Sequence, residues 1–142
     1  MRNFFLYFLC GLFLNCSISN SIEINNLSGY WEIDFITEKN EKFVPKGNPL
    51  IYDHYYLEYP KGVLNKVEFR LDGILSSSED VTPFKIEKID KKYYIRFKSR
   101  WYEWSKKISH LDSKILILEH NKKSYNYKRP TLLNPINEQI RE

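Results

Sequence analysis

Apolar and polar residues alternate along much of the chain, which is the pattern of β-strands that bury one face. The first such segment shows it most clearly, because Trp31, Ile33 and Phe35 would share one face and Glu32 and Asp34 the other. Such a pair of carboxylates could serve acid–base chemistry, but it is more often the wet face of a strand. We interpret it as the wet face.

Eight strands are predicted, over 29–37, 50–59, 63–71, 82–89, 93–98, 101–109, 114–120 and 123–129. Most are joined by tight turns at Asp90–Lys91–Lys92 and Asn121–Lys122 or by short polar loops such as 76–80. The stretch 38–48 is a predicted loop with a short extended piece at Phe43–Val44. No segment of helical period interrupts the series of strands. These features favour an all-β fold, an eight-stranded antiparallel up-and-down meander closed into a barrel.

The alternation also predicts which side chains share a face. In the strand over 63–71, one face would carry Val63, Val67, Phe69 and Leu71, and the other Lys66, Glu68 and Arg70. In the following hairpin, Phe84 and Ile86 would face Tyr93, Ile95 and Phe97. The candidate lining of an interior pocket is Phe69, Phe84, Tyr93, Phe97, Trp104, Tyr125 and Tyr127. Inward tyrosines need partners for their hydroxyls, so they favour a semi-polar cavity over plain core filling, which stays the alternative.

Composition agrees with a folded β-domain. Aromatic residues make up 16% and hydrophobic residues 42% of the 142 residues, and there is no alanine. The net charge of +4 arises from 22 basic and 18 acidic residues that are interleaved, so no nucleic-acid partner is expected. Three lysine pairs, at 91–92, 106–107 and 122–123, are interpreted as solvated residues near turns; alternatively they form a basic end that faces anionic lipid.

The first residues are interpreted as an export signal. Arg2 is followed by an apolar run over 4–14, which is too short to span a bilayer. Phe13-Leu14-Asn15-Cys16 resembles a bacterial lipobox, so 1–16 would be a signal that ends at a lipid-bearing Cys16. Ordinary cleavage after Ser19 or Ser21 is the alternative, and would give a secreted protein. We expect a lipoprotein of the bacterial cell envelope, in the periplasm or at the outer membrane, held to the membrane by this lipid.

The rest of the chain divides into three parts. The polar stretch 17–27 is a predicted tether, 28–130 the barrel, and 131–142 a tail with a short helix from Asn134 to Arg141. Both cysteines, Cys10 and Cys16, precede the barrel, so no disulfide is expected inside it.

The segment Leu27-Ser28-Gly29-Tyr30-Trp31-Glu32-Ile33 resembles the Gly-x-Trp start of lipocalins and of shorter bacterial lipocalin-like proteins. The segments 66–73, 92–95, 103–106 and 124–129 resemble later strands of exported lipocalin-like, calycin-type β-barrel proteins of Bacteroidetes. The resemblance implies that Trp31 lies at the barrel floor and that Arg129 packs over it, a contact worth about 0.5–2 kcal/mol. It also implies a non-enzymatic protein that binds a small apolar or amphipathic molecule.

Catalytic and metal chemistry finds little support in the sequence. His54, His110 and His120 have no metal-ligand spacing, and no phosphate-binding or nucleophile motif occurs. We therefore expect no enzyme activity, cofactor or metal. A weak alternative is an enzyme at the barrel mouth that uses His54 with Glu58.

A second alternative is a filled barrel that serves as an envelope interaction or structural module. Its contacts with a protein partner, which the sequence does not identify, would be Tyr30, Tyr52, Tyr94 and Trp101. The barrel interior discriminates between the ligand-binding hypothesis and the interaction hypothesis. A cavity of roughly 300 Å³ or more supports ligand binding, and a packed interior supports the interaction role.

Overall fold

A computed structural model describes residues 22–46, 51–70 and 74–131. In these ranges the chain forms one short 3₁₀ helix and nine strands. They are η1 (Ile24–Leu27), β1 (Gly29–Glu38), β2 (Glu41–Phe43), β3 (Ile51–Glu58), β4 (Lys61–Phe69), β5 (Leu75–Ile89), β6 (Lys92–Lys98), β7 (Glu103–Leu111), β8 (Ile115–His120) and β9 (Lys123–Lys128). The predicted export signal with Cys16, residues 17–21 and the helix from Asn134 to Arg141 lie outside the described residues.

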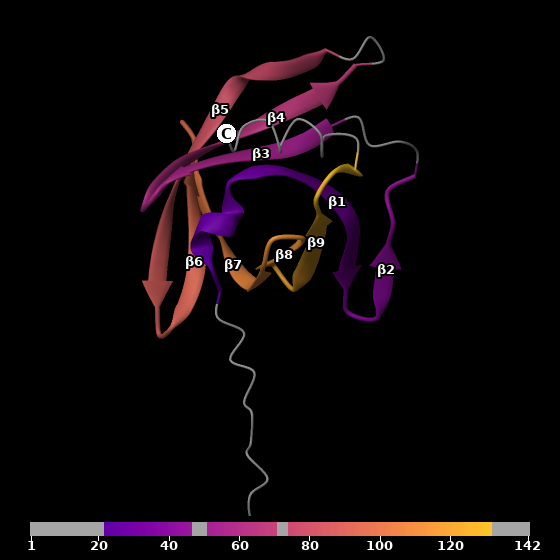
Figure 1. Cartoon of the computed structure of the whole chain (residues 1–142). Coiled ribbons are helices and arrows are strands. Elements are labelled where there is room, and N and C mark those ends of the chain that lie inside the picture. The colour runs from indigo at the N-terminus through magenta and orange to yellow at the C-terminus, as the bar shows by residue number, and fades with distance from the viewer. Residues whose placement is uncertain (1–21, 47–50, 71–73, 132–142) are drawn as a thin grey trace, which may run out of the picture.

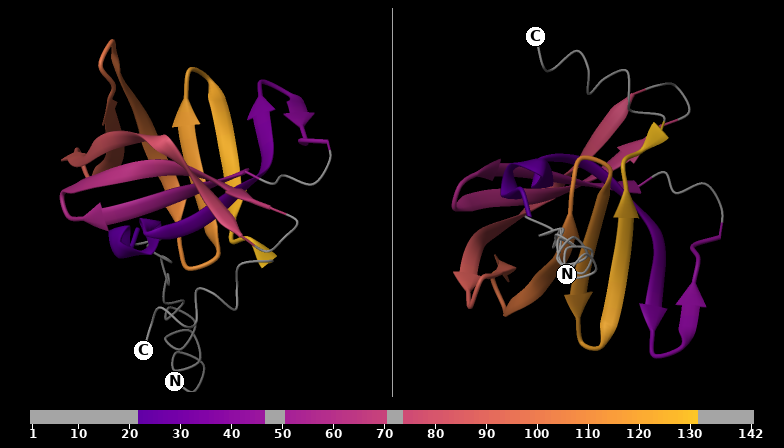
Figure 2. Two further views of the ribbon diagram at one scale, coloured as in Figure 1. Left: turned by 90° about the horizontal axis from the view of Figure 1, so that it is seen from above. Right: turned by 60° about the horizontal axis from the view of Figure 1, so that its bottom comes forward.

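The strands form one antiparallel meander that closes on itself. Their order is β2-β1-β3-β4-β5-β6-β7-β8-β9, and β9 pairs in turn with β1. Strand β1 and strands β3 to β9 thus make an eight-stranded closed barrel, while β2 pairs with the far end of β1 as an extra strand (Figures 1 and 2). The predicted fold class, an eight-stranded lipocalin-like barrel, is confirmed by this topology.

One end of the barrel is filled by a hydrophobic core. Its buried residues are Leu27, Trp31, Tyr55, Phe84, Ile86, Ile95, Phe97, Ile108, Leu111, Leu116, Leu118 and Tyr127. Facing positions of β5 and β6 contribute the pairs Phe84–Phe97 and Ile86–Ile95, as the alternation predicts. The indole Nε1 of Trp31 donates to the Leu27 carbonyl over 2.9 Å, which attaches η1 to the floor of the barrel.

Residues 22–27 differ from the predicted tether. Ile22 and Ile24 pack against the core, and Leu27 is fully buried. These three apolar side chains lie within an Asn/Ser-rich stretch, and they cover the barrel end rather than stay in solvent. The folded body therefore includes residues from position 22, not 28.

Tight turns fix the registers of two hairpins. Asp90 and Lys91, which join β5 to β6, both have positive φ, and so do Asn121 and Lys122 between β8 and β9. Two consecutive residues with positive φ define the type I′ turn, whose twist matches that of paired strands. Both hairpins were predicted from sequence.

A β-bulge in β1 changes the predicted faces of that strand. The pairing with β9 skips one residue between Ile33 and Phe35, so the alternation is shifted after this point. Ile36 consequently lines the interior together with Ile33. Phe35 lies on the outer face, where the Lys42 ammonium is 3.9 Å from its ring centroid. The prediction that Phe35 shares a face with Trp31 is wrong.

Strand β5 begins earlier than predicted and includes the serine-rich stretch 76–80. Polar side chains link it to β4, because the Asn65 side chain donates to Ser77 Oγ over 2.6 Å. Both faces of this part are exposed to solvent, so it has no apolar alternation by which a strand could be recognised. Strand β7 begins at Glu103 rather than at the predicted Trp101.

Candidate functional site

The barrel interior opens into a pocket of about 820 Å³ above the Trp31 floor. Side chains from six strands line it: Trp31, Ile33, Ile36, Ile51, Asp53, Leu64, Lys66, Glu68, Thr82, Trp104, Lys106, Tyr125 and Tyr127. The volume lies within the range of about 300–1,000 Å³ that is usual for small-molecule sites. The barrel is therefore not filled from end to end.

Most of the pocket wall is apolar or aromatic. Trp104 stacks on Phe97 with ring centroids 5.1 Å apart and planes inclined by 14°, so its indole is held in place. Ile33, Ile36 and Leu64 contribute aliphatic surface across the barrel. This wall suits the hydrocarbon part of a ligand.

A buried carboxylate interrupts the apolar wall. Asp53 is only 6% exposed, and the Lys66 ammonium forms an ion pair with it. Burial, together with the charge of Asp53 and a hydrogen bond to it, raises the pKa of Tyr127 well above its usual value. The neutral Tyr127 hydroxyl thus serves as a donor to the carboxylate. Asp53 is accordingly satisfied by two partners, as a buried charge must be.

Lys106 is a second cation in the pocket wall. It pairs with Ile95 across β6 and β7, so its side chain points inward. Its Nζ lies 4.8 Å from the Tyr125 ring centroid and 5.8 Å from that of Phe97. Among the described residues, no carboxylate lies within ion-pair distance of this ammonium. Burial lowers the pKa of Lys106, the charge of Lys66 lowers it further, and attraction by Asp53 opposes both.

Tyr55 is fully buried in the hydrophobic core. Within the described part of the chain, its hydroxyl is the one buried side-chain polar atom without a hydrogen-bond partner. Burial raises the pKa of Tyr55 well above its usual value, and the proximity of Tyr127 and Asp53 adds to the shift.

The face of β4 that points into the barrel is the one that the sequence pattern predicts to face solvent. Lys66 and Glu68 line the pocket, whereas Phe69 does not. The register explains the reversal, since Gly62 lies opposite Phe84 and leaves room for its ring inside the barrel. Positions 64, 66 and 68 then also point inward, and the charge at 66 is accommodated because Asp53 lies opposite.

The other predicted lining residues separate into two groups. Trp104, Tyr125 and Tyr127 line the pocket. Phe84 and Phe97 are buried in the core beneath it, and Tyr93 packs against that core. Sequence reasoning misses the charged lining residues, because the alternating pattern and the nearby turns predict that Lys66 and Lys106 face solvent. Asp53 was the available signal, because it is a carboxylate among aromatic and aliphatic residues in the middle of a predicted strand.

The structure brings Trp31 and Arg129 together at the barrel floor. The Arg129 guanidinium carbon lies 3.6 Å from the Trp31 ring centroid. Arg129 also donates to the carbonyls of Tyr30 and Asn26 over 3.1 and 2.6 Å. This arrangement plugs the end of the barrel that is opposite the pocket mouth.

The candidate catalytic residues do not form a site. His54 stacks on Tyr30 on the outer face, with centroids 4.3 Å apart, and burial lowers the pKa of His54. Glu58 instead accepts a hydrogen bond from the Tyr56 hydroxyl. Residues four apart in a strand are about 13 Å apart, beyond hydrogen-bond reach.

The other two histidines and the Glu32–Asp34 pair have structural partners. His110 contacts Asp112 over 2.9 Å, and His120 contacts the Ser105 carbonyl over 2.8 Å. Glu32 and Asp34 share the Lys128 ammonium, at 3.3 and 3.1 Å. No cluster of three or more metal-ligating side chains occurs in ranges 22–46, 51–70 and 74–131.

The four outer aromatic residues differ in exposure. Trp101 is 80% exposed, whereas Tyr52 is 1% exposed and offers no contact surface. Tyr30 and Tyr94 are half-buried. The predicted outer contact face is thus incomplete.

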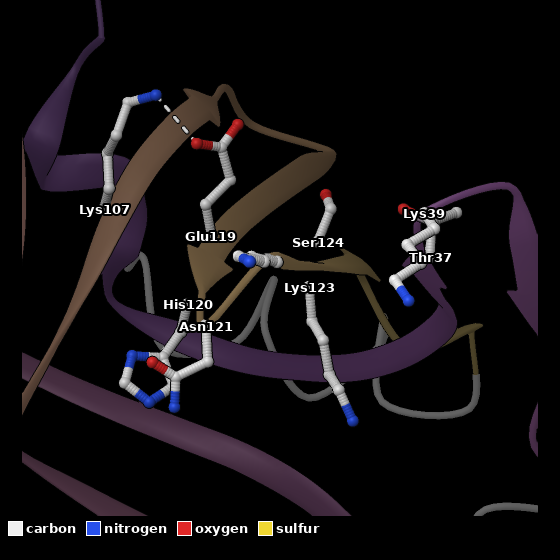
Figure 3. A pocket seen from close by; sticks show the side chains of 9 residues that line it. Thr37, Lys39, Lys107, Glu119, His120, Asn121, Lys123 and Ser124 are labelled. Carbon is white, nitrogen blue, oxygen red and sulfur yellow. Dashed lines mark hydrogen bonds and ion pairs between the residues drawn. The ribbon is translucent and has the colours of Figure 1, made fainter.

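A smaller hollow of about 420 Å³ lies at the turn between β8 and β9 (Figure 3). It carries several lysines, but two of them are ion-paired. Lys107 contacts Glu119 over 2.8 Å, and Lys123 contacts Glu38 over 3.2 Å. Figure 3 shows the Lys107 and Lys123 side chains at separate sides of the hollow. These cations do not converge on a ligand, so the barrel pocket is the better candidate site.

Among the residues described, no helix has the length and apolar character needed to cross a membrane.

Comparison with known proteins gives structural likenesses only. No known protein family and no curated protein matches the sequence. A lipocalin-like protein from Bacteroides uniformis superposes with a TM-score of 0.46 at 12% identity, covering 74% of this chain and 99% of that one. An uncharacterized protein from Bacteroides eggerthii gives 0.46 at 12% identity, with coverages of 72% and 98%. Lobster apocrustacyanin A1 gives 0.45 at 14% identity, with coverages of 84% and 69%.

Proposed function

We propose that this protein binds a small amphipathic molecule inside its barrel and catalyses no reaction. The observation that carries the proposal is the open pocket of about 820 Å³. This volume is above the roughly 300 Å³ that a small-molecule site needs, whereas a filled barrel would leave no such space. Its wall offers the indoles of Trp31 and Trp104 to an apolar body. Its charged lining residues, Asp53, Lys66 and Lys106, provide for a polar end of the ligand.

The place of action that we propose is the bacterial cell envelope. The apolar run over 4–14 and the lipobox-like end at Cys16 support export and attachment by lipid. Intact mass spectrometry of the protein from its native membranes tests this part. A diacylglyceryl mass on Cys16 is expected, and a chain that starts at Ser17, Asn20 or Ile22 would contradict lipidation.

Ligand binding is tested with N-phenyl-1-naphthylamine, a neutral probe that fluoresces in apolar sites. The purified protein in detergent-free buffer should bind about one probe per chain. Thr82→Trp places a bulky ring at a pocket-lining position, and it should weaken binding at least about tenfold. Val81→Trp is the matched control, because Val81 is the neighbouring residue, is 51% exposed and does not line the pocket.

The two variants separate the possible outcomes. Loss of binding in Thr82→Trp with retention in Val81→Trp supports the barrel as the site. Equal binding by both variants would place the probe elsewhere on the surface. Absence of binding by the unmodified protein would favour an interaction module, for which the 80% exposed Trp101 is the best candidate contact.

A further inference from the structure

We propose that Lys106 recognises an anionic head, a carboxylate or a phosphate, on the ligand that the pocket takes. This inference rests on the proposed binding function and adds the chemical class of the ligand. It is carried by the position of one ammonium group inside the barrel.

The other charges of the pocket wall are already paired or lie at its exposed rim. Asp53 is held by Lys66 and Tyr127. Lys66 is engaged by that ion pair, and Glu68 is exposed to solvent. Lys106 differs, because it faces the same pocket while no carboxylate in the described ranges comes within ion-pair distance.

The surroundings of Lys106 are aromatic. Its Nζ approaches the rings of Tyr125 and Phe97, and its strand neighbour Trp104 also lines the pocket. Rings stabilise a cation less well than a hydrogen-bonded anion does, so the ammonium retains a strong preference for an anionic partner. The lowered pKa of Lys106 has the same origin, since burial removes water without supplying a full counter-charge.

The pocket also sets the shape of the ligand. Aliphatic and aromatic side chains, among them Ile33, Ile36 and Trp104, surround the space next to Lys106. An anion with an apolar body can therefore contact the ammonium and the hydrophobic wall at the same time. A small inorganic anion would contact the ammonium but not the hydrophobic wall. A neutral lipid would contact the hydrophobic wall without supplying a charge to the ammonium.

A matched pair of fluorescent probes tests the inference. 1-Anilinonaphthalene-8-sulfonate has the skeleton of N-phenyl-1-naphthylamine with an added sulfonate. The anionic probe should bind roughly ten- to hundredfold more tightly, the gain expected of a hydrogen bond to a charged group. Lys106→Met should reduce this ratio of affinities to within about twofold of one.

Two control variants isolate the role of the ammonium. Lys107→Met removes a cation that lies next in sequence but pairs with Glu119 outside the pocket, and it should preserve the ratio. Lys106→Arg should retain most of the preference. Thermal melts of all variants establish that they are folded.

Displacement of the bound probe then distinguishes the two sources of an anionic head. Dodecanoate and dodecyl phosphate should both displace the probe better than dodecanol does. The stronger competitor of the two identifies the preferred head as a carboxylate or a phosphate. The inference is overturned if the anionic probe has no advantage, or if Lys106→Met leaves that advantage intact while the neutral probe still binds. If neither probe binds, both the proposed binding function and the inference about Lys106 fail.

Discussion

The guanidinium of Arg129 rests on the ring of Trp31, 3.6 Å from its centroid, and thereby joins the end of the last barrel strand to the first. The same side chain donates hydrogen bonds to the carbonyls of Asn26 in η1, Tyr30 in β1 and Ser113 between β7 and β8. A planar guanidinium can satisfy all of these contacts at once, whereas an ammonium cannot.

Arg129→Lys should therefore lower the free energy of unfolding by about 1–3 kcal/mol, although the charge is kept. Urea denaturation measures the change. Arg96→Lys is the control, since Arg96 pairs with Glu87 on the surface and its replacement should change stability by less than about 0.5 kcal/mol. Equal effects of the two substitutions would show that Arg129 has no special role in the floor.

Two buried tyrosines should respond in opposite ways to loss of the hydroxyl. Tyr55→Phe removes a polar atom without a partner among the described residues, and should leave stability unchanged or raise it by about 1 kcal/mol. Tyr127→Phe removes a donor to Asp53 and should destabilise the protein by about 1–2 kcal/mol. Thermal unfolding at neutral pH compares them, and destabilisation by Tyr55→Phe would reveal an unseen partner such as a bound water.

Gly62 is expected to tolerate no side chain. A Cβ at this position would overlap the Phe84 ring and the Tyr56 carbonyl, so Gly62→Ala should cost about 1–3 kcal/mol of stability. Adding Phe84→Leu should restore part of the loss, because it removes the ring but not the carbonyl. A double-mutant cycle by urea denaturation measures the coupling. If the effects of the two substitutions on the free energy of unfolding were strictly additive, the Phe84 ring would not be what excludes a side chain at position 62.

Acid stability should depend on Asp112. The backbone N–H of Lys114, the His110 ring and the Ile115 N–H lower the pKa of Asp112 from 3.8 to about 2. A lowered pKa in the folded state means that ionised Asp112 contributes stability above about pH 4, and that this contribution is lost as the pH falls toward 2. The melting temperature of the protein should thus exceed that of Asp112→Asn at pH 5, with the gap closing near pH 2. A gap that is independent of pH would contradict this.

Much of the barrel could be predicted from the period-two pattern. The hairpin at Asn121–Lys122 has turn residues that tolerate positive φ, and the strands on either side alternate clearly. The shift in β1 could not be predicted, because Phe35 and Ile36 are both apolar and the bulge that selects between them depends on pairing with the distant β9.

The polar part of the pocket was harder to foresee. A strand pattern shows that two faces differ, but not which face is inside a barrel with a wet interior. Lys66 and Lys106 look like solvent-facing residues in sequence, yet both point inward. Only the register that puts Asp53 opposite Lys66 makes this arrangement favourable, and cross-strand register is a long-range property.

The pairing of β1 with β9 also has a consequence for how the protein folds. Glu32 finds its strand partner only in Lys128, close to the end of the barrel sequence. One hydrogen-bonding edge of β1 therefore stays unpaired until β9 has been synthesised. Closure over so long a separation is slow, and an exposed edge invites pairing with other chains. A chaperone that shields this edge before the last strand arrives would increase the yield of native protein without altering its final stability.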